Sequence, residues 1–151
     1  MRISAKVDYA VRAAVELAAA GDHPMKGERI STAQGIPLNF LENILSDLRH
    51  AGVVRSQRGA EGGYWLARSA DAITVADVIR AVEGPLASVR GTPPEETSYD
   101  GAAEPLQRVW IAVRANLRSV LEKTTLADVA TGALPATIAK LADDDDAWHT
   151  R

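Results

Sequence analysis

Residues 35–67 read GIPLNFLENILSDLRHAGVVRSQRGAEGGYWLA, and this stretch decides the fold. Its first half predicts a helix over about Pro37–Ala51, because Leu41, Ile44, Leu45 and Leu48 recur at helical spacing. Proline suits the first turn of a helix, where its missing N–H has no partner, and Gly52 supplies the stop.

The second half of the stretch predicts a β-hairpin. Val53–Arg58 and Tyr64–Ala67 have strand character, and the turn between them is rich in glycine. Upstream, helices are expected over Ala5–Ala20, capped by Ser4, and over Gly27–Gln34. Three helices followed directly by a hairpin is the order of a winged helix-turn-helix, in which the hairpin is the wing.

The remaining chain predicts further helices and no further sheet. A capping-box-like start at Thr74 opens a helix to about Glu83, and another short helix begins at Thr125. The segment Arg90–Glu104 is rich in proline and glycine and is expected to be a mobile loop. The longest helix is expected over about Pro105–Lys123.

We therefore predict a mainly α fold with a small β-hairpin, divided into four parts. Residues 1–86 form the winged helix-turn-helix, 87–104 a loop, 105–142 a dimerisation helix with short C-terminal helices, and 143–151 an acidic, frayed tail. The long helix carries apolar residues at spacings of four and three, typical of a seam between helices. The predicted dimerisation residues are Leu106, Trp110, Val113, Leu117 and Val120. For Trp110, contact with a ligand is the alternative to packing in the dimer core.

Composition narrows the class of protein. The net charge is −3, but residues 1–91 are about neutral, and the acidic excess lies in the second part, notably in the four aspartates 143–146. There is no cysteine, and the three histidines are far apart, so no metal site is expected. No apolar run approaches the ~18 residues of a membrane span, and the N-terminus lacks signal-peptide features. We expect a cytoplasmic protein without a membrane partner.

A winged helix-turn-helix binds DNA by placing its third helix in the major groove. The side chains free to face outward there include Asn, which pairs with adenine edges, and Glu, which accepts from cytosine N4. The predicted contacts on this helix are Leu38, Asn39, Phe40, Glu42, Asn43, Ser46 and Arg49. Phe40 packs either on DNA, against a thymine methyl group or the sugar backbone, or in the core between the second and third helices; both alternatives stay open.

The hairpin carries the second set of predicted DNA contacts. Positive side chains on a hairpin tip can follow phosphates or enter a narrow minor groove, and Arg58 beside the glycine turn is best placed to do so. The predicted wing contacts are Arg55, Ser56, Arg58 and Gly59, with Arg2 and Lys6 at the start of the first helix as backbone contacts. The alternative for the wing is a solvated hairpin whose arginines pair with Glu61. Asp8 and Arg12 are expected to form a surface ion pair.

The sequence resembles the Rrf2 (Rrf-two) family of bacterial transcription regulators. The residues that carry the resemblance span nearly the whole chain: 2–6, 8–12, 35–37, 40–42, 48–49, 51–54, Ser56, 58–59, 62–67, 73–85, Trp110 and 124–129. The resemblance implies a homodimer joined through the long helix that binds a near-palindromic operator. It also implies that the third helix enters the major groove and that Arg58 reaches the minor groove.

One departure from the family pattern concerns the sensor. Many relatives place three cysteines in the loop before the long helix and bind an iron–sulfur cluster there, whereas the loop Arg90–Glu104 has none. In some relatives the position of Asp8 ligates the cluster from the partner subunit. The prediction is therefore a regulator without cluster or other cofactor, whose signal is a small molecule or a partner protein acting through this loop.

Three classes of function compete for this sequence. The favoured one is a DNA-binding transcriptional regulator, a homodimeric repressor that acts on double-stranded operator DNA. The second is a winged-helix protein-interaction module that does not bind DNA. An enzyme is not expected, because the chain has no nucleophile elbow, phosphate-binding loop or clustered His and carboxylate residues.

Overall fold

The structure, a computed structural model, describes the whole chain, residues 1–151. The elements are α1 (Ala5–Ala20), α2 (Gly27–Gln34), α3 (Leu38–His50), β1 (Val54–Gln57), β2 (Gly63–Leu66), α4 (Val75–Glu83), α5 (Leu106–Leu121), α6 (Leu126–Thr131) and α7 (Ala136–Ala142). Four short 3₁₀ turns join them: η1 (Ala70–Ala72), η2 (Pro94–Glu96), η3 (Gly101–Ala103) and η4 (Asp145–Trp148). The prediction of a mainly helical chain with one hairpin is confirmed.

Helix α1 lies at the centre of the core. Its alanines Ala10, Ala13 and Ala14 are fully buried, and their small side chains let α3, α4 and α6 pack closely around it. From α3 the predicted stripe Leu41, Ile44, Leu45 and Leu48 is buried against it, as the periodicity indicates. Burying this stripe fixes the rotation of α3 and therefore which of its side chains face outward.

Two matching caps begin α4 and α6, and the starts of the two helices are bridged. The Thr74 hydroxyl accepts from the Asp77 backbone N–H, and the Asp77 carboxylate accepts from the Thr74 N–H; Thr125 and Asp128 repeat the same capping box. The two helix starts are joined by backbone bonds, Val75 N–H to the Thr124 carbonyl and Leu126 N–H to the Ile73 carbonyl, both 2.9 Å. This pairing brings residues 124–131 back onto the N-terminal half of the chain.

The wing is an antiparallel pair in which Val54 faces Leu66 and Gln57 faces Gly63. Gly62 closes the turn: a Cβ there would lie 2.1 Å from the Gln57 carbonyl oxygen, so no other residue fits without a shift of the backbone. On its other edge β2 is joined to Met25, whose N–H and carbonyl both bond to Tyr64. The wing is therefore attached to the chain just before α2.

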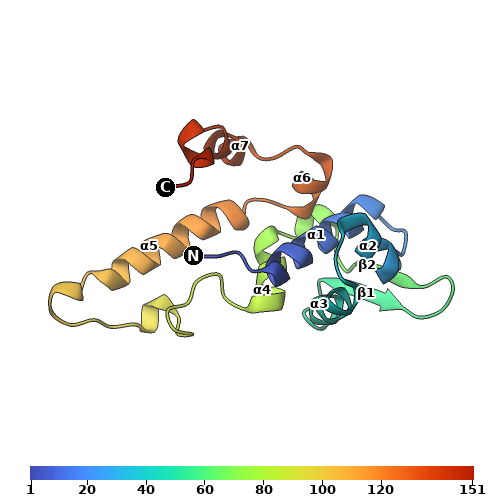
Figure 1. Cartoon of the computed structure of the whole chain (residues 1–151), viewed down its shortest axis with the longest axis horizontal. Helices are drawn as coiled ribbons and strands as arrows, with labels where there is room; N and C mark the ends of the chain where they lie inside the picture. Colours follow the sequence, from blue (N-terminus) through green and yellow to red (C-terminus); the bar gives the residue numbers. More distant parts are fainter.

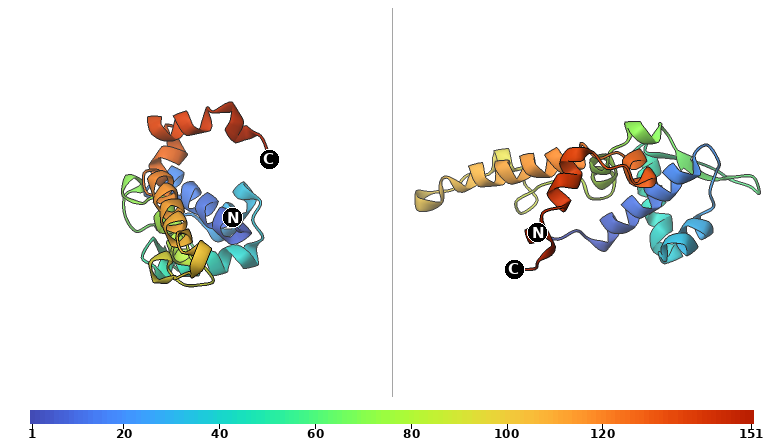
Figure 2. Two further views of the ribbon diagram at one scale, coloured as in Figure 1. Left: turned by 90° about the vertical axis from the view of Figure 1, so that its left-hand side faces the viewer. Right: turned by 90° about the horizontal axis from the view of Figure 1, so that it is seen from above.

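Helix α5 extends away from this core, so that the molecule is elongated (Figure 1). Although α5 is rich in apolar residues, none of its residues is fully buried. Figure 2 shows both chain termini on the same side of α5. None of the helices combines the length and the apolar composition needed to cross a membrane.

The structure differs from the prediction at several boundaries. Pro37 and Pro105 are the N-caps, so α3 and α5 begin one residue later than expected. Both strands are shorter than predicted, because the ladder runs only from Val54 to Gln57 and from Gly63 to Leu66. The expected loop contains the short turns η2 and η3, and the expected acidic tail contains η4, with hydrogen bonds from Gln107 and Trp148 to backbone carbonyls in or beside these segments.

Candidate nucleic-acid interface

The outward face of α3 carries the polar side chains predicted to contact bases. Asn39, Glu42 and Asn43 are exposed, whereas Leu38 and Ser46 are half-buried at its edges. Phe40 is 58% exposed, so it does not close the core between α2 and α3. Burial of the opposite stripe thus places an aromatic ring and three polar groups on one solvent-facing surface.

Only part of this surface is used by internal hydrogen bonds. The Asn43 amide donates to the Asn39 carbonyl at 3.2 Å, and the His50 ring lies 2.7 Å from the Ser46 carbonyl. The side chains of Asn39 and Glu42 have no hydrogen-bond partner in the chain. Their donors and acceptors are available to a ligand.

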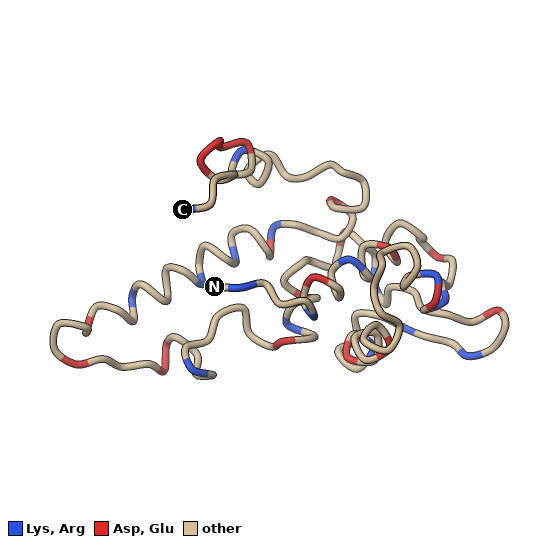
Figure 3. The backbone as a smooth tube through the Cα atoms, in the orientation of Figure 1, with Lys and Arg blue, Asp and Glu red and all other residues tan.

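The positive charges beside this face are unpaired. Arg49, Arg55 and Arg58 are exposed, and none of them belongs to any ion pair in the structure. The alternative in which the wing arginines pair with Glu61 is therefore not what the structure shows. Figure 3 shows basic residues along the hairpin, whereas acidic residues gather in the C-terminal turn. Unpaired cations on an extended hairpin favour an anionic partner.

A polar cleft of about 360 Å³ separates the wing from α2 and α3. Three cations line it, Lys26, Arg49 and Arg58, together with the carboxylates of Glu28 and Glu42. The Lys26 ammonium donates a hydrogen bond to the Gly59 carbonyl at the wing tip. Lys26 is not among the residues predicted from the sequence. It is the N-cap residue of α2, a position where lysine is not a favoured residue, and this is the only local feature of the sequence that marks it.

Arg2 and Lys6 do not line the cleft between the wing and α3. Lys6 pairs with Asp47 at 2.8 Å and so links α1 to α3. Arg2 lies beside α5, where it lines a different depression. Both stay predicted DNA contacts, whereas Ser56 and Gly59 lie in the cleft beside Arg58.

A second depression is an apolar groove of about 770 Å³ along α5. It is lined by the N-terminal residues Met1–Ile3, the end of α4 and residues 85–90, together with Trp110, Val113 and Leu117 of α5. Three of the five predicted dimerisation residues thus share one groove. Leu106 and Val120 lie outside it, and all five are half-buried.

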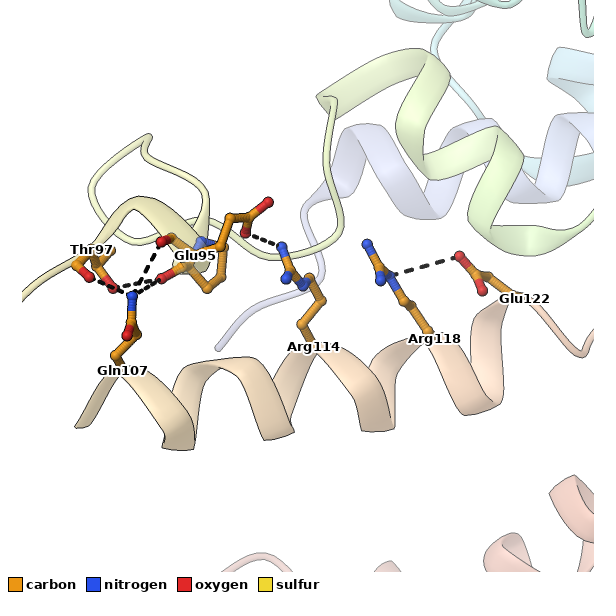
Figure 4. A network of polar contacts seen from close by, with 7 residues as sticks. Glu95, Thr97, Gln107, Arg114, Arg118 and Glu122 are labelled. Atoms are coloured by element: carbon orange, nitrogen blue, oxygen red, sulfur yellow. Dashed lines mark hydrogen bonds and ion pairs between the residues drawn. The ribbon is translucent and has the colours of Figure 1, made fainter. Parts of the chain in front are cut away.

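The loop 87–104 is fastened to α5 by polar contacts (Figure 4). The Gln107 amide donates to the carbonyls of Thr97 at 2.5 Å, Glu95 at 3.2 Å and Pro94 at 3.3 Å, and Arg114 forms an ion pair with Glu95. Hydrogen bonding to the backbone at Glu95 and the Arg114 guanidinium together lower the pKa of the Glu95 carboxyl.

The residues present do not fit an iron–sulfur cluster. The chain has no cysteine, and no three His, Asp or Glu side chains lie close enough together to hold a metal ion. Asp8 pairs with Arg12 at 2.9 Å, as predicted from their spacing. The carboxylate is thus engaged within its own helix.

Comparison with known proteins places the chain among regulators. The model of the Rrf2 family, described as iron-dependent transcriptional regulators, matches residues 3–132. The putative HTH-type transcriptional regulator Rv1287 of Mycobacterium tuberculosis is 55% identical over 145 residues, which cover 95% of this chain and 90% of that protein. CymR of Bacillus subtilis, another HTH-type transcriptional regulator, is 39% identical over 132 residues, 87% of this chain and 91% of that protein.

Solved structures show the same fold. CymR of B. subtilis, described as the global cysteine regulator, superposes with a TM-score of 0.74 at 38% identity, over 88% of this chain and 98% of that chain. IscR of T. potens superposes with a TM-score of 0.69 at 32% identity, over 100% of this chain and 93% of that chain. The winged helix, the unpaired cations and these similarities agree: the chain belongs to the Rrf2 family of DNA-binding transcriptional regulators and is not an enzyme.

Proposed function

We propose that the chain is a homodimeric repressor that recognises a near-palindromic operator through α3 and the wing. The observation that carries the proposal is that the unpaired Arg49 and Arg58 line one cleft with Glu42 of the outward face of α3, while Arg55 is exposed and unpaired on the same wing. Phosphate contacts supply most of the affinity for DNA, and base-edge contacts supply the specificity. This surface has groups for both.

We assign the contacts by chemistry. Asn39 and Asn43 offer amides to adenine, Glu42 accepts from cytosine, and Phe40 packs on a thymine methyl group in the major groove. Arg58 enters the minor groove from the wing tip. The remaining predicted contacts on α3 and the wing, Leu38, Ser46, Arg49, Arg55, Ser56 and Gly59, position the protein along the phosphates and groove walls, with Arg2 and Lys6 at the start of α1 as further backbone contacts.

Helix α5 supports the homodimer. It carries eight apolar side chains larger than alanine, among them Trp110, Val113 and Leu117, yet no residue of it is buried in the single chain. An apolar groove of this extent on a lone subunit is typical of an interface. In a twofold dimer the same patch of each subunit contacts its counterpart. The winged helices of the two subunits then bind successive half-sites of the DNA.

The signal is proposed to act without a cluster. Loop 87–104 touches α5 through Gln107 and through the Tyr99 hydroxyl, which accepts from the Trp110 indole N–H at 3.0 Å. A small molecule in the groove or a partner protein on the loop would therefore displace residues that also belong to the proposed dimer interface. Either signal thereby changes the distance between the winged helices of the two subunits.

Selection from a pool of random DNA duplexes at low salt tests the proposal. The purified chain is expected to enrich an inverted repeat whose half-site centres lie about 10–10.5 base pairs, or a multiple of this, apart. A protein-interaction module would enrich nothing. A single non-repeated motif would support DNA binding and contradict the homodimer.

A further inference from the structure

The C-terminal segment 133–148, which we call the arm, is folded but carries exposed apolar side chains. Leu134, Leu141 and Trp148 are 43%, 58% and 77% exposed. Helix α7 packs chiefly against η4, and the Trp148 indole N–H donates to the Ala142 carbonyl at 2.5 Å. The arm is thus closed on itself and leaves three large apolar side chains without a cover. It lies beyond residues 3–132, the part that the family model matches.

The arm is placed next to the proposed dimer interface. Both panels of Figure 2 show the arm and the N-terminus projecting from the same side of α5. Met1 and Ile3 at that N-terminus line the apolar groove together with Trp110, Val113 and Leu117. A second copy that occupies the groove therefore lies between the N-terminus and the arm.

The charges of the arm and of α5 are complementary. From Leu106 to Leu121, α5 carries three arginines and no acidic residue, whereas the arm carries the aspartates 143–146. Of these, Asp146 pairs with Arg151 of its own chain, and the other three have no ion-pair partner. Within one chain Arg114 pairs with Glu95 and Arg118 with Glu122, but Arg108 has no ion-pair partner. Helices α5 and α7 of one chain are not packed on each other. The charges of the arm are therefore complementary to α5 of a second subunit.

We propose that the arm clasps a second copy of this chain. Leu134, Leu141 and Trp148 of one subunit cover the back of the partner's α5, and the aspartates 143–146 lie near its Arg108. Twofold symmetry makes the contact twice. This inference rests on the homodimer proposed above and adds to it a contact that the α5 seam alone does not provide.

Sedimentation equilibrium measures the contribution of the arm. Removal of residues 133–151 is expected to raise the dimer dissociation constant by about 10- to 100-fold, since a few large apolar side chains lose their cover. The double variant Leu141→Asp, Trp148→Ala should do the same, whereas Lys140→Gln on the same helix should not. If the truncated chain dimerises as tightly as the full chain, the proposed arm contact is wrong, but the proposed homodimer stands. A monomeric full-length chain overturns both.

Crosslinking locates the contact, because the chain is free of cysteine. A Leu141→Cys chain is mixed with an epitope-tagged Arg108→Cys chain and treated with a short bis-maleimide. The expected product is the mixed dimer, distinguished by its size. Glu61→Cys at the wing tip, in place of Arg108→Cys, is the control and should give none. If the two pairs crosslink equally, or neither does while the chains are dimeric, the proposal is wrong.

Discussion

Arg12 of α1 donates a hydrogen bond from Nη1 to the carbonyl oxygen of Gln34, the last residue of α2, at 2.6 Å. The same guanidinium pairs with Asp8 and lies 4.9 Å from the ring centre of Tyr9. Arg12 therefore satisfies a helix-end carbonyl at the turn between the two helices of the DNA-binding motif. Gly35 follows with a φ of 62°, a conformation that glycine adopts without strain.

Loss of this hydrogen bond should destabilise the fold. Arg12→Met is expected to lower the free energy of unfolding by about 1.5–3 kcal/mol, the usual range for hydrogen bonds to charged groups. Asp8→Asn removes only an exposed ion pair and should cost less than about 1 kcal/mol. Urea unfolding of both variants checks the order. If Asp8→Asn were the more damaging change, Asp8 would have a role that the ion pair does not explain.

Removal of the wing arginine Arg58 should lower the affinity for DNA and make that affinity less dependent on the salt concentration. Arg58→Ala is expected to reduce the log–log salt slope by about 0.9 for each phosphate that the Arg58 guanidinium neutralises in the wild type. Arg68→Ala is the matched control, because Arg68 is exposed but follows the wing and pairs with Asp77. Fluorescence anisotropy with the selected operator measures both. Equal effects of the two changes would show that Arg58 makes no special contact.

The wing turn should not tolerate a side chain at residue 62. In Gly62→Ala the added Cβ would overlap the backbone of Gln57, so the strands must separate at the tip. We expect unchanged helix content by circular dichroism but weaker operator binding. Ala60→Gly, at an exposed position of the same turn, should leave the affinity nearly unchanged. If Gly62→Ala bound the operator with the affinity of the wild type, operator binding would not depend on the shape of the wing tip.

Acid should loosen loop 87–104 from α5. Because the pKa of Glu95 is lowered in the folded chain, its stabilising effect is complete above the ordinary glutamate pKa and is lost as the pH falls through the lowered value. The difference in unfolding free energy between the wild type and Glu95→Gln should therefore shrink with acidification. Glu104→Gln, an exposed carboxylate without an ion pair, should show no such trend. A difference independent of pH would contradict the role of the charge.

Local patterns suffice to predict the parts of the fold that rest on short-range chemistry. The stripe Leu41–Leu48 sets the orientation of α3, and Thr74 with Asp77 specifies a helix start within four residues. For this reason the outward side chains of α3 can be assigned from the sequence alone. Phe40 lies at the edge of the stripe, where periodicity allows either face, and only packing decides its exposure.

Long-range contacts cannot be predicted in this way. Gln107 bonds to backbone carbonyls 10 to 13 residues away, and a carbonyl leaves no signature in a side-chain pattern. Lys26 reaches the wing because Met25 pairs with Tyr64, a bridge between segments 39 residues apart. The hydrogen bond from Trp148 to the Ala142 carbonyl, which links the tail to the end of α7, is likewise invisible in the polar, acidic composition of the tail.

The salt dependence of operator binding tests the central claim most directly. For the wild-type dimer, the logarithm of the association constant should fall linearly with the logarithm of the salt concentration, with a slope of about −0.9 per phosphate contacted. The combined variant Arg49→Ala, Arg55→Ala, Arg58→Ala should bind more weakly and with a shallower slope. No binding at low salt, or a slope that these changes leave unaltered, would contradict DNA recognition by this surface.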